Sequence, residues 1–462
     1  MSTAATQPGS AGATHLAEIE SIAAGGAGVA RLDGRVVFIP RTVPGDSIQF
    51  RVSGDKGKFL VGELAEIASA GETRREPPCA HWAACGGCPL QQMTPESQNE
   101  AKSRIFLDTL ARIGKIDLPA PPGMLTPPGP EFGYRMRARF QIKGGEIGFY
   151  APGTRNLVPI ESCLLVEEPV AEAATEISRL LRAEPASHGA EAVEITSLGE
   201  DTGEGAGLFL SPPGWRDRGK GALSRRTRRA WEAFGRANGW PLVASGERSP
   251  EEPPAWTSRY ELEDPDGEYA SLSLEVSPES FIQPNRPMNR LLVKVVLDMA
   301  ALPEGGNAVD LFCGAGNFAL PLAGRSGRIG RVAGVEANPY AVRDAEANSR
   351  AAGLDNIHFI RCEAERVRSA DILGALGGKA PDLALLDPPR RGALETIPLV
   401  MALGPGRIVY VSCNPATFAR DAREIARGGY RLESALIAPM FPNSAHLESV
   451  TLWTREDSPA PD

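Results

Sequence analysis

From about residue 284 onward, short apolar runs alternate with segments long enough to be helices. The runs are NAVDLF, RVAGVEA, IHFIRC, LALLD, RIVYVSC and SVTLW. Parallel strands need crossover connections, which are usually helices, so this alternation predicts a mostly parallel, doubly wound sheet. Sheets of this kind bind ligands at the carboxyl edge of their strands. We therefore expect a Rossmann-like α/β domain over residues 284–455, with its functional side chains at that edge.

The length and composition restrict the class of protein further. A chain of 462 residues is longer than one hydrophobic core usually serves, so we expect several domains. No apolar run reaches the roughly 18 residues of a membrane span, and the start of the chain lacks a signal-peptide pattern. These features predict a cytoplasmic protein with no membrane partner and no obligatory protein partner. Residues 1–14 are expected to be a disordered tail and residues 456–462 a second tail.

Residues 15–70 contain short β-rich runs, such as RVVFIP and SIQFRVS, between Gly, Asp-Gly and Pro-Gly turns. Turns at this spacing predict a small β-barrel. The spacing fits a structural cap as well as an oligonucleotide-binding barrel. Residues 71–283 are expected to form an α+β central domain, with a helix over 94–114 that is placed to pack on the catalytic domain.

A glycine-rich loop follows the first strand of the α/β domain and opens a helix, in the motif DLFCGAGNF. Gly314 and Gly316 allow the backbone to turn sharply and to approach a ligand. Glu336 ends the next strand, where its carboxylate can accept hydrogen bonds from the hydroxyls of a ribose. The pattern predicts an adenosine-type ligand, but it fits a nicotinamide dinucleotide as well as S-adenosylmethionine (SAM).

The motif LLDPPRRG places Asp387 at the end of a later strand, ahead of two prolines that stiffen the turn. Methyltransferases of this architecture present groups there to the methionine end of SAM and to the target base. Hydride transfer has no evident use for such a motif. Asp387 therefore favours SAM over a nicotinamide cofactor.

The motif VSCNPATFARD places Cys413 at the carboxyl end of the fifth strand of the domain. Carbon 5 of a pyrimidine is a poor nucleophile, so its methylation requires a thiolate to add at carbon 6 and generate an enolate. A base must then remove the carbon 5 proton, and Glu448 in HLESV is placed to do so. The pattern predicts Cys413 as nucleophile and Glu448 as general base.

Together with CAHWAACGGCPLQQ and FIQPN, these motifs make the chain resemble the RNA uracil-5-methyltransferases, specifically their iron-sulfur-containing 23S ribosomal RNA branch, over nearly its whole length. The resemblance implies an N-terminal TRAM domain, SAM-dependent methylation of uridine and an RNA partner, with 23S rRNA favoured and tRNA possible. It implies the same roles for Cys413 and Glu448. The cofactor contacts expected from the motifs and the resemblance are Gln283, Phe312, Gly314, Gly316, Asn317, Glu336, Glu363 and Asp387. Glu363 stands where such enzymes often have an aspartate for the adenine amino group.

Four of the seven cysteines form a candidate metal site. Cys79, Cys85 and Cys88 have the spacing Cys-x5-Cys-x2-Cys, and Cys163 is the expected fourth ligand. Four thiolates can hold zinc or an iron-sulfur cluster, and the spacing does not choose between them. The resemblance implies a [4Fe-4S] cluster. Because the thiolate mechanism needs no redox step, we expect the cluster to have a structural or RNA-positioning role.

The charge distribution permits an RNA-binding groove without requiring one. The net charge of −9 argues weakly against a global attraction to nucleic acid. Residues 151–283 contain 13 Lys and Arg against 23 Asp and Glu, so the rest of the chain is close to neutral. Arg135, Arg137 and Arg139 share one face of a predicted strand and are candidates for RNA contacts.

The alternatives to a 23S rRNA uracil-5-methyltransferase are a tRNA uracil-5-methyltransferase, an RNA cytosine-5-methyltransferase, a nicotinamide-dependent oxidoreductase and a non-catalytic RNA-binding protein.

Overall fold

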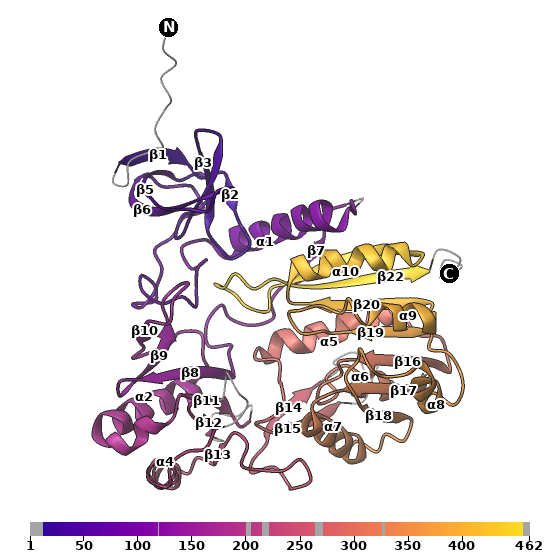
Figure 1. Ribbon diagram of the computed structural model, residues 1–462. Coiled ribbons are helices and arrows are strands. Elements are labelled where there is room, and N and C mark those ends of the chain that lie inside the picture. Colours follow the sequence, from indigo (N-terminus) through magenta and orange to yellow (C-terminus); the bar gives the residue numbers. More distant parts are fainter. Residues whose placement is uncertain are drawn as a thin grey trace.

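The computed structural model describes residues 13–118, 120–199, 205–214, 221–263, 271–325 and 329–455. Figure 1 shows an N-terminal group of strands, a central sheet with helices, and a C-terminal α/β domain. Residues 1–12 of the predicted N-terminal tail and all of the predicted C-terminal tail, residues 456–462, lie outside the described residues. Thr14, the last residue of the predicted N-terminal tail, is instead the first residue of a strand. No helix among the described ranges is long and apolar enough to cross a membrane.

The N-terminal part is one strongly curved sheet. Its strands are β1 (Thr14–Glu18), β2 (Ser21–Ile22), β3 (Gly28–Leu32), β4 (Arg35–Ile39), β5 (Ser47–Asp55) and β6 (Leu60–Ser69), in the order β1-β5-β6-β4-β3-β2. Side chains alternate between the two faces of each strand, so Val37, Ile39, Ile48 and Phe50 all point inward and are fully buried. This inward face supplies a small core of its own.

The central part is a second six-stranded sheet covered by helices. The sheet contains β8 (Arg137–Lys143), β9 (Glu146–Tyr150), β10 (Leu157–Pro159), β11 (Ala192–Ser197), β12 (Ala206–Ser211) and β13 (Leu242–Ala244), in the order β10-β9-β8-β11-β12-β13. Its helices are α2 (Glu168–Ala183), η2 (Pro185–Gly189) and α4 (Arg225–Asn238). Trp231 of α4 is fully buried, and its Nε1 donates to Ser187 O at 3.0 Å.

The C-terminal part is the doubly wound sheet that the sequence predicts. Its elements are α5 (Arg286–Ala300), β16 (Gly306–Leu311), α6 (Ala319–Ala323), β17 (Ile329–Glu336), α7 (Pro339–Ala351), β18 (Ile357–Arg361), α8 (Ser369–Ala375), β19 (Leu383–Leu386), α9 (Ile397–Leu403), β20 (Arg407–Ser412), α10 (Pro415–Arg427), β21 (Tyr430–Ala438) and β22 (Glu448–Arg455). With the short β7 (Gly123–Met124), the strand order is β18-β17-β16-β19-β20-β22-β21-β7. The five strands from β16 to β20 are parallel, and β22 runs antiparallel to β20. The beginning of β22 therefore lies at the edge where the parallel strands end.

The predicted helix over 94–114 forms as α1 (Pro95–Thr109), followed by a wider π-helical turn, η1 (Leu110–Gly114). Thr94 caps its start, because the Thr94 side chain accepts from Ser97 N. The helix lies against α10, where Phe106 and Phe418 stack with ring centroids 5.6 Å apart. Segments that lie far apart in the sequence thus share one hydrophobic core (Figure 1).

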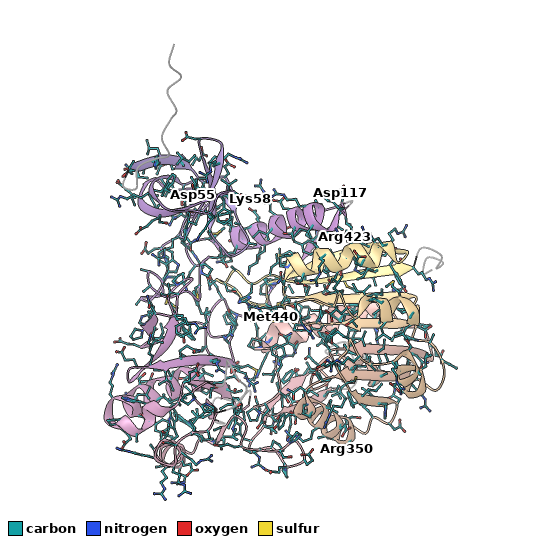
Figure 2. All side chains as sticks on the ribbon, viewed as in Figure 1. Asp55, Lys58, Asp117, Arg350, Arg423 and Met440 are labelled. Atoms are coloured by element: carbon teal, nitrogen blue, oxygen red, sulfur yellow. The ribbon has the colours of Figure 1, made fainter. Side chains whose placement is uncertain are left out.

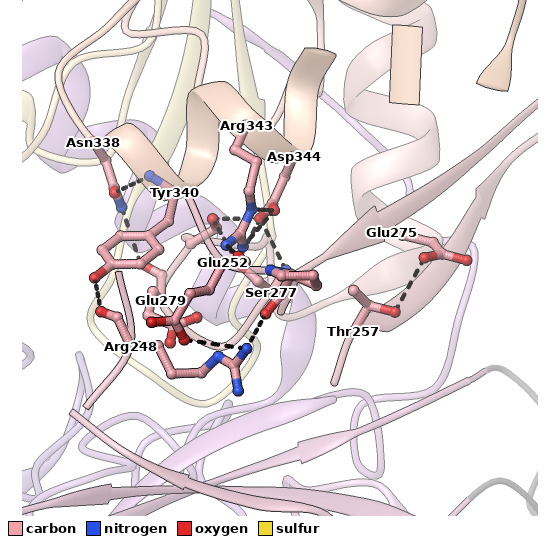
Figure 3. Close-up of polar contacts among 12 residues, drawn as sticks. Arg248, Glu252, Thr257, Glu275, Ser277, Glu279, Asn338, Tyr340, Arg343 and Asp344 are labelled. Atoms are coloured by element: carbon pink, nitrogen blue, oxygen red, sulfur yellow. Dashed lines mark hydrogen bonds and ion pairs between the residues drawn. The ribbon is translucent and has the colours of Figure 1, made fainter. Parts of the chain in front are cut away.

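A hairpin of β14 (Ser258–Leu262) and β15 (Leu272–Val276) packs in the same core as the catalytic sheet. Figure 3 shows the polar seam beside it, between residues 248–257 and α7. Tyr340 Oη donates to Arg248 O at 2.7 Å, and Arg343 Nη1 donates to Glu252 O at 2.9 Å. The domain boundary that we drew at 283 stays a prediction, although this hairpin is attached to the catalytic side.

The junction between the N-terminal sheet and the next segment depends on Asp46. Its buried carboxylate accepts from Arg74, from Gly71 N at 2.9 Å and from Val43 N at 2.7 Å. Burial alone would raise the pKa of Asp46, but these hydrogen bonds and the charge of Arg74 outweigh it and hold the pKa below its usual value. Asp46 therefore stabilises the fold in its charged form.

We predict that Asp46→Asn lowers the free energy of unfolding by about 3 kcal/mol, because it leaves Arg74 without its buried partner. A carboxyl whose folded pKa is lowered stabilises above its unfolded pKa, so the deficit of the variant should shrink as pH falls below about 4. Calorimetric unfolding of the full chain against pH measures both effects. Asp55→Asn, which disrupts an exposed pair with Arg35, is the matched control and should change stability much less. An equal loss in both variants would contradict the role of burial.

Candidate active site

The glycine-rich loop after β16 has an unusual backbone. Phe312 has a φ of 72°, in the left-handed region where an aromatic residue is rare, and Gly314 and Gly316 also have positive φ. A Cβ on Gly316 would come within 2.6 Å of the Leu320 side chain, so no other residue fits without displacement. Phe312 can keep this strained conformation only because the surrounding structure enforces it. Strained residues of this kind cluster at functional sites.

Glu336, at the end of β17, is attached to this loop. One of its carboxylate oxygens accepts from Gly314 N at 3.0 Å and the other from Asn338 N at 2.7 Å. Asn338 in turn caps α7, because its Oδ1 accepts from Tyr340 N at 3.0 Å. The carboxylate is therefore fixed between the glycine loop and a helix start, with lone pairs left for the hydroxyls of a ligand.

The remaining predicted cofactor contacts differ in their surroundings. Gln283 is buried in the segment between β15 and α5, whereas Glu363 is exposed after β18 and pairs with Arg366 at 2.9 Å. The Asn317 amide is already engaged: its Oδ1 accepts from Asn289 Nδ2 at 2.7 Å and its Nδ2 donates to Asn289 Oδ1 at 3.1 Å. Asn317 thus holds the glycine loop against α5, and a direct contact with the cofactor stays a prediction.

Asp387, Cys413 and Glu448 come together at the carboxyl edge. Asp387 directly follows β19, and Cys413 directly follows β20. Ser412 pairs with Ser449 in the antiparallel ladder, so one further step of the same register places Cys413 opposite Glu448. The sheet topology therefore juxtaposes a thiol and a buried carboxyl group that lie far apart in the sequence.

Burial dominates the electrostatics of these three groups. Burial raises the pKa of Asp387 to about 7. Burial and then the charge of Asp387 raise the pKa of Glu448 well above its usual range, and Arg390 offsets part of this. Burial, Glu448 and Asp387 raise the pKa of Cys413 to about 12. These shifts favour the neutral thiol of Cys413, and the neighbouring carboxyl groups would favour a cationic ligand.

The four candidate metal ligands, Cys79, Cys85, Cys88 and Cys163, line a single cavity of about 300 Å³. Burial and the neighbouring thiols raise the pKa of Cys88 to about 12. Within the described part of the chain, no group of three Cys, His, Asp or Glu side chains is arranged to hold a metal ion. The structure brings the four thiols together but does not show the cluster.

Comparisons with known proteins agree with this geometry. Residues 270–456 match the family model described as tRNA (Uracil-5-)-methyltransferase, and residues 10–65 match the TRAM domain. A protein of Pseudomonas aeruginosa named 23S rRNA (uracil(1939)-C(5))-methyltransferase RlmD is 36% identical over 94% of this chain and 93% of its own length. A protein of the same name from Alkalilimnicola ehrlichii is 34% identical over 93% of this chain and 94% of its own length. The chain belongs to the 23S rRNA uracil-5-methyltransferase family.

Among solved structures, the Pyrococcus abyssi tRNA (uracil-54, C5)-methyltransferase in complex with S-adenosyl-L-homocysteine has the same fold. It is 22% identical, with a TM-score of 0.68 and coverage of 95% of this chain and 100% of that one. The predicted family, the N-terminal strands and the C-terminal methyltransferase fold are therefore confirmed.

One residue of this family member that the sequence argument did not single out is Asp310. It lies within β16, is fully buried, and neither carboxylate oxygen has a hydrogen-bond partner of normal geometry in the described ranges. Burial and then the charges of Asp387 and Glu336 raise its pKa well above the usual range. The signal in the sequence is a single acidic residue near the end of a mostly apolar strand, just before the glycine-rich loop.

Arg390 and His446 form a pair close to Cys413 and Glu448. The Arg390 guanidinium donates to His446 Nδ1 at 2.9 Å, and burial together with the nearby cations lowers the pKa of His446 to about 4. The neutral imidazole therefore acts as an acceptor that holds Arg390. Arg390 is the cation that lowers the pKa of both Cys413 and Glu448.

The three candidate RNA-contacting arginines do share one face. Arg135, Arg137 and Arg139 line a cavity of about 520 Å³ together with Phe281, whose exposed fraction of 68% is high for a large apolar residue. Arg137 is mostly committed to the protein, because it donates to Thr196 Oγ1 at 2.9 Å and to Ser280 O at 2.6 Å. Contact of these arginines with RNA stays a prediction.

Proposed function

We propose that this protein uses SAM to methylate carbon 5 of a uridine in 23S rRNA, at the position equivalent to the uracil 1939 for which its relatives are named. The observation that carries the proposal is the convergence of Cys413, Asp387 and Glu448 at the edge of a methyltransferase sheet. An rRNA substrate assigns the protein to the cytoplasm, and the reaction requires no second protein.

The covalent mechanism follows from the positions of Cys413 and Glu448. The Cys413 thiolate adds to carbon 6, and the displaced π electrons form an enolate. Carbon 5 then attacks the methyl group that bound SAM supplies, and the sulfur–methyl bond breaks. Glu448 removes the proton from carbon 5, the carbon 5–carbon 6 double bond re-forms, and Cys413 leaves with the electrons of its bond to carbon 6.

The residues at the sheet edge suit SAM. Glu336 is placed to accept from the ribose hydroxyls, and the strained turn from Phe312 to Gly316 allows close approach of the backbone. Glu363 is assigned to the adenine amino group, and Gln283 and Asp387 to the methionine end. The positive sulfonium would lower the raised pKa values of Asp387, Glu448 and Cys413, and so favour the thiolate only once SAM is bound.

The target uridine has to leave its stack to meet this site. A stacked, paired base hides carbon 6 from a thiol, so the substrate is a loop nucleotide or one that is flipped out. The arginine-lined cavity with exposed Phe281 lies where the central sheet faces the methyltransferase domain and offers positive charge for the RNA backbone.

The cysteine site suits a [4Fe-4S] cluster. Four thiolates around one zinc ion would lie about 3.8 Å apart, given a zinc–sulfur distance of about 2.3 Å and tetrahedral geometry. A cubane cluster binds each thiolate to a different iron atom, so the sulfurs spread further and surround a larger space. The cavity of about 300 Å³ that all four cysteines line leaves room for the second arrangement.

Incubation with labelled SAM and unmodified transcripts of 23S rRNA and tRNA tests the function. We expect the label in 5-methyluridine of 23S rRNA after nuclease digestion and mass mapping, and no label with Cys413→Ala, since the nucleophile is lost. Label in tRNA alone would overturn the assignment of 23S rRNA as the substrate. Label in 5-methylcytidine would overturn the assignment of uridine as the target base. Turnover retained by Cys413→Ala would overturn the covalent mechanism.

Glu448→Gln should trap the covalent intermediate. The amide cannot accept the carbon 5 proton, so methylated RNA stays attached to Cys413 and forms a band that resists denaturation on a gel. The double variant with Cys413→Ala is the control and should give no such band. Free release of methylated RNA by Glu448→Gln at the wild-type rate would exclude Glu448 as the base.

Protein purified without oxygen should contain about four iron and four sulfide per chain, as a cubane cluster held by four cysteines requires. Cys88→Ser should lose both, because it removes one of the four proposed ligands that line the shared cavity. Cys362→Ser, which changes a cysteine at the end of β18 outside that cavity, is the matched control and should keep both. Stoichiometric zinc without sulfide would contradict the cluster.

A further inference from the structure

The loop between β21 and β22 leads directly into Glu448. We name residues 439–447 the base loop. Figure 2 places Met440 of this loop near the middle of the molecule, on the side of the C-terminal domain that faces the central part. A loop on the surface of a sheet would normally be solvated, yet Met440 and Asn443 are fully buried. Something other than local sequence therefore determines its conformation.

Consecutive backbone carbonyls of the base loop accept hydrogen bonds from three separate segments. The donors are Asn285 Nδ2 to Met440 O at 2.9 Å, Lys102 Nζ to Phe441 O at 3.0 Å and Tyr134 Oη to Pro442 O at 3.1 Å. These donors come from the start of α5, from α1 and from the segment before β8. The loop is thus held from several sides at once.

Asn443 is the most constrained residue of the base loop. It has a φ of 66°, a conformation that costs a non-glycine residue free energy unless its surroundings enforce it. Its N donates to Gln98 Oε1 at 2.8 Å and its carbonyl accepts from Leu90 N at 3.0 Å. Its Oδ1 accepts from Arg75 Nη2 at 3.0 Å and from Gln98 Nε2 at 3.2 Å.

The same contacts join the base loop to the cysteine-bearing segment, residues 75–92. Leu90, which binds Asn443, lies two residues after Cys88. Its neighbour Gln91 accepts through Oε1 from Cys79 N at 3.0 Å and through its carbonyl from Arg75 Nε at 3.0 Å. One short segment therefore contacts both the cysteine site and the loop.

We infer that Asn443 is a positioning residue for Glu448, through which the cysteine-bearing segment and α1 hold the base loop and keep Glu448 beside Cys413. The inference rests on the proposed function. Glu448 is the first residue of β22, and the ladder to β20 begins with the next residue, Ser449. Release of the loop would loosen this strand end, while Cys413, on the other side of the ladder, keeps its place at the start of α10.

The two reacting groups act at different steps, which makes the inference specific. Cys413 acts before methyl transfer, whereas Glu448 acts after it. A displaced Glu448 therefore slows the release of methylated RNA without slowing formation of the covalent adduct, since Glu448 raises the pKa of Cys413 and its displacement can only favour the thiolate. A general loss of folding would reduce both steps together.

Two variants separate the loop contacts from folding. Asn443→Gly keeps the left-handed backbone and removes the side chain that binds Arg75 and Gln98; it also removes Nδ2, which is buried without a partner in the described structure. Lys102→Met removes a buried amine but keeps the length of the side chain. Phe441 O stays bonded in Lys102→Met because Ser444 Oγ also donates to it at 3.1 Å.

The experiment measures, for an rRNA fragment and SAM, the rate of adduct formation in a single turnover and the rate of 5-methyluridine release. For Asn443→Gly we expect release to fall about 10- to 100-fold, because small displacements of a catalytic group cost rates of that order, with adduct formation no slower than in the wild type. Adduct should then accumulate as it does in Glu448→Gln, and Lys102→Met should show a smaller effect of the same kind. Asn238→Gly, at the exposed end of α4, is the control and should match the wild type.

Equal losses of adduct formation and release in both variants, or no change in either, would overturn the inference. If Asn443→Gly does not fold, the same two rates in Lys102→Met decide it. Wild-type protein that makes no 5-methyluridine would instead overturn the proposed function. The two failures are therefore distinguishable.

Discussion

The antiparallel ladder between β20 and β22 is the constraint on which the site depends. The pairing of Ser412 with Ser449 places the thiol of one strand end opposite the carboxyl group at the beginning of the other. A shift of one residue would turn Glu448 to the opposite face of the sheet, because side chains alternate along a strand. The last strand of this sheet must therefore run against its neighbours for the proposed nucleophile and base to meet.

The carboxyl groups of the site are electrostatically unfavourable to one another. Asp310, Asp387 and Glu448 are placed at one edge, and burial raises the pKa of each. Like charges in a poorly solvated site destabilise the ionised state, and Arg390 offsets only part of this. A bound sulfonium would relieve the repulsion, so the same acids that disfavour the thiolate of Cys413 in the free protein favour binding of a cationic cofactor.

The sequence predicts the parallel strands and their ends well, because buried parallel strands are continuous apolar runs and Glu336, Asp387 and Cys413 each lie at the end of one. It does not predict the partners of Asn317, because the contact with Asn289 joins the glycine loop to a helix whose relative placement leaves no periodic signal. Asp310 was missed for a related reason. One acid within an apolar strand gives no indication of which side chains face it.

The base loop suggests a structural role for the proposed cluster, since the proposed chemistry needs no electron transfer. Gln98 and Asn443 are 345 residues apart in the chain, and the hydrophobic core shared by α1 and α10 brings α1 to the methyltransferase domain. A cluster bound by Cys79, Cys85, Cys88 and Cys163 would fix the segment that carries Leu90 and Gln91 before it meets the loop. The contacts to Asn443 would then form between two ordered surfaces, and the position of Glu448 would depend on the integrity of the cysteine site while that of Cys413 would not.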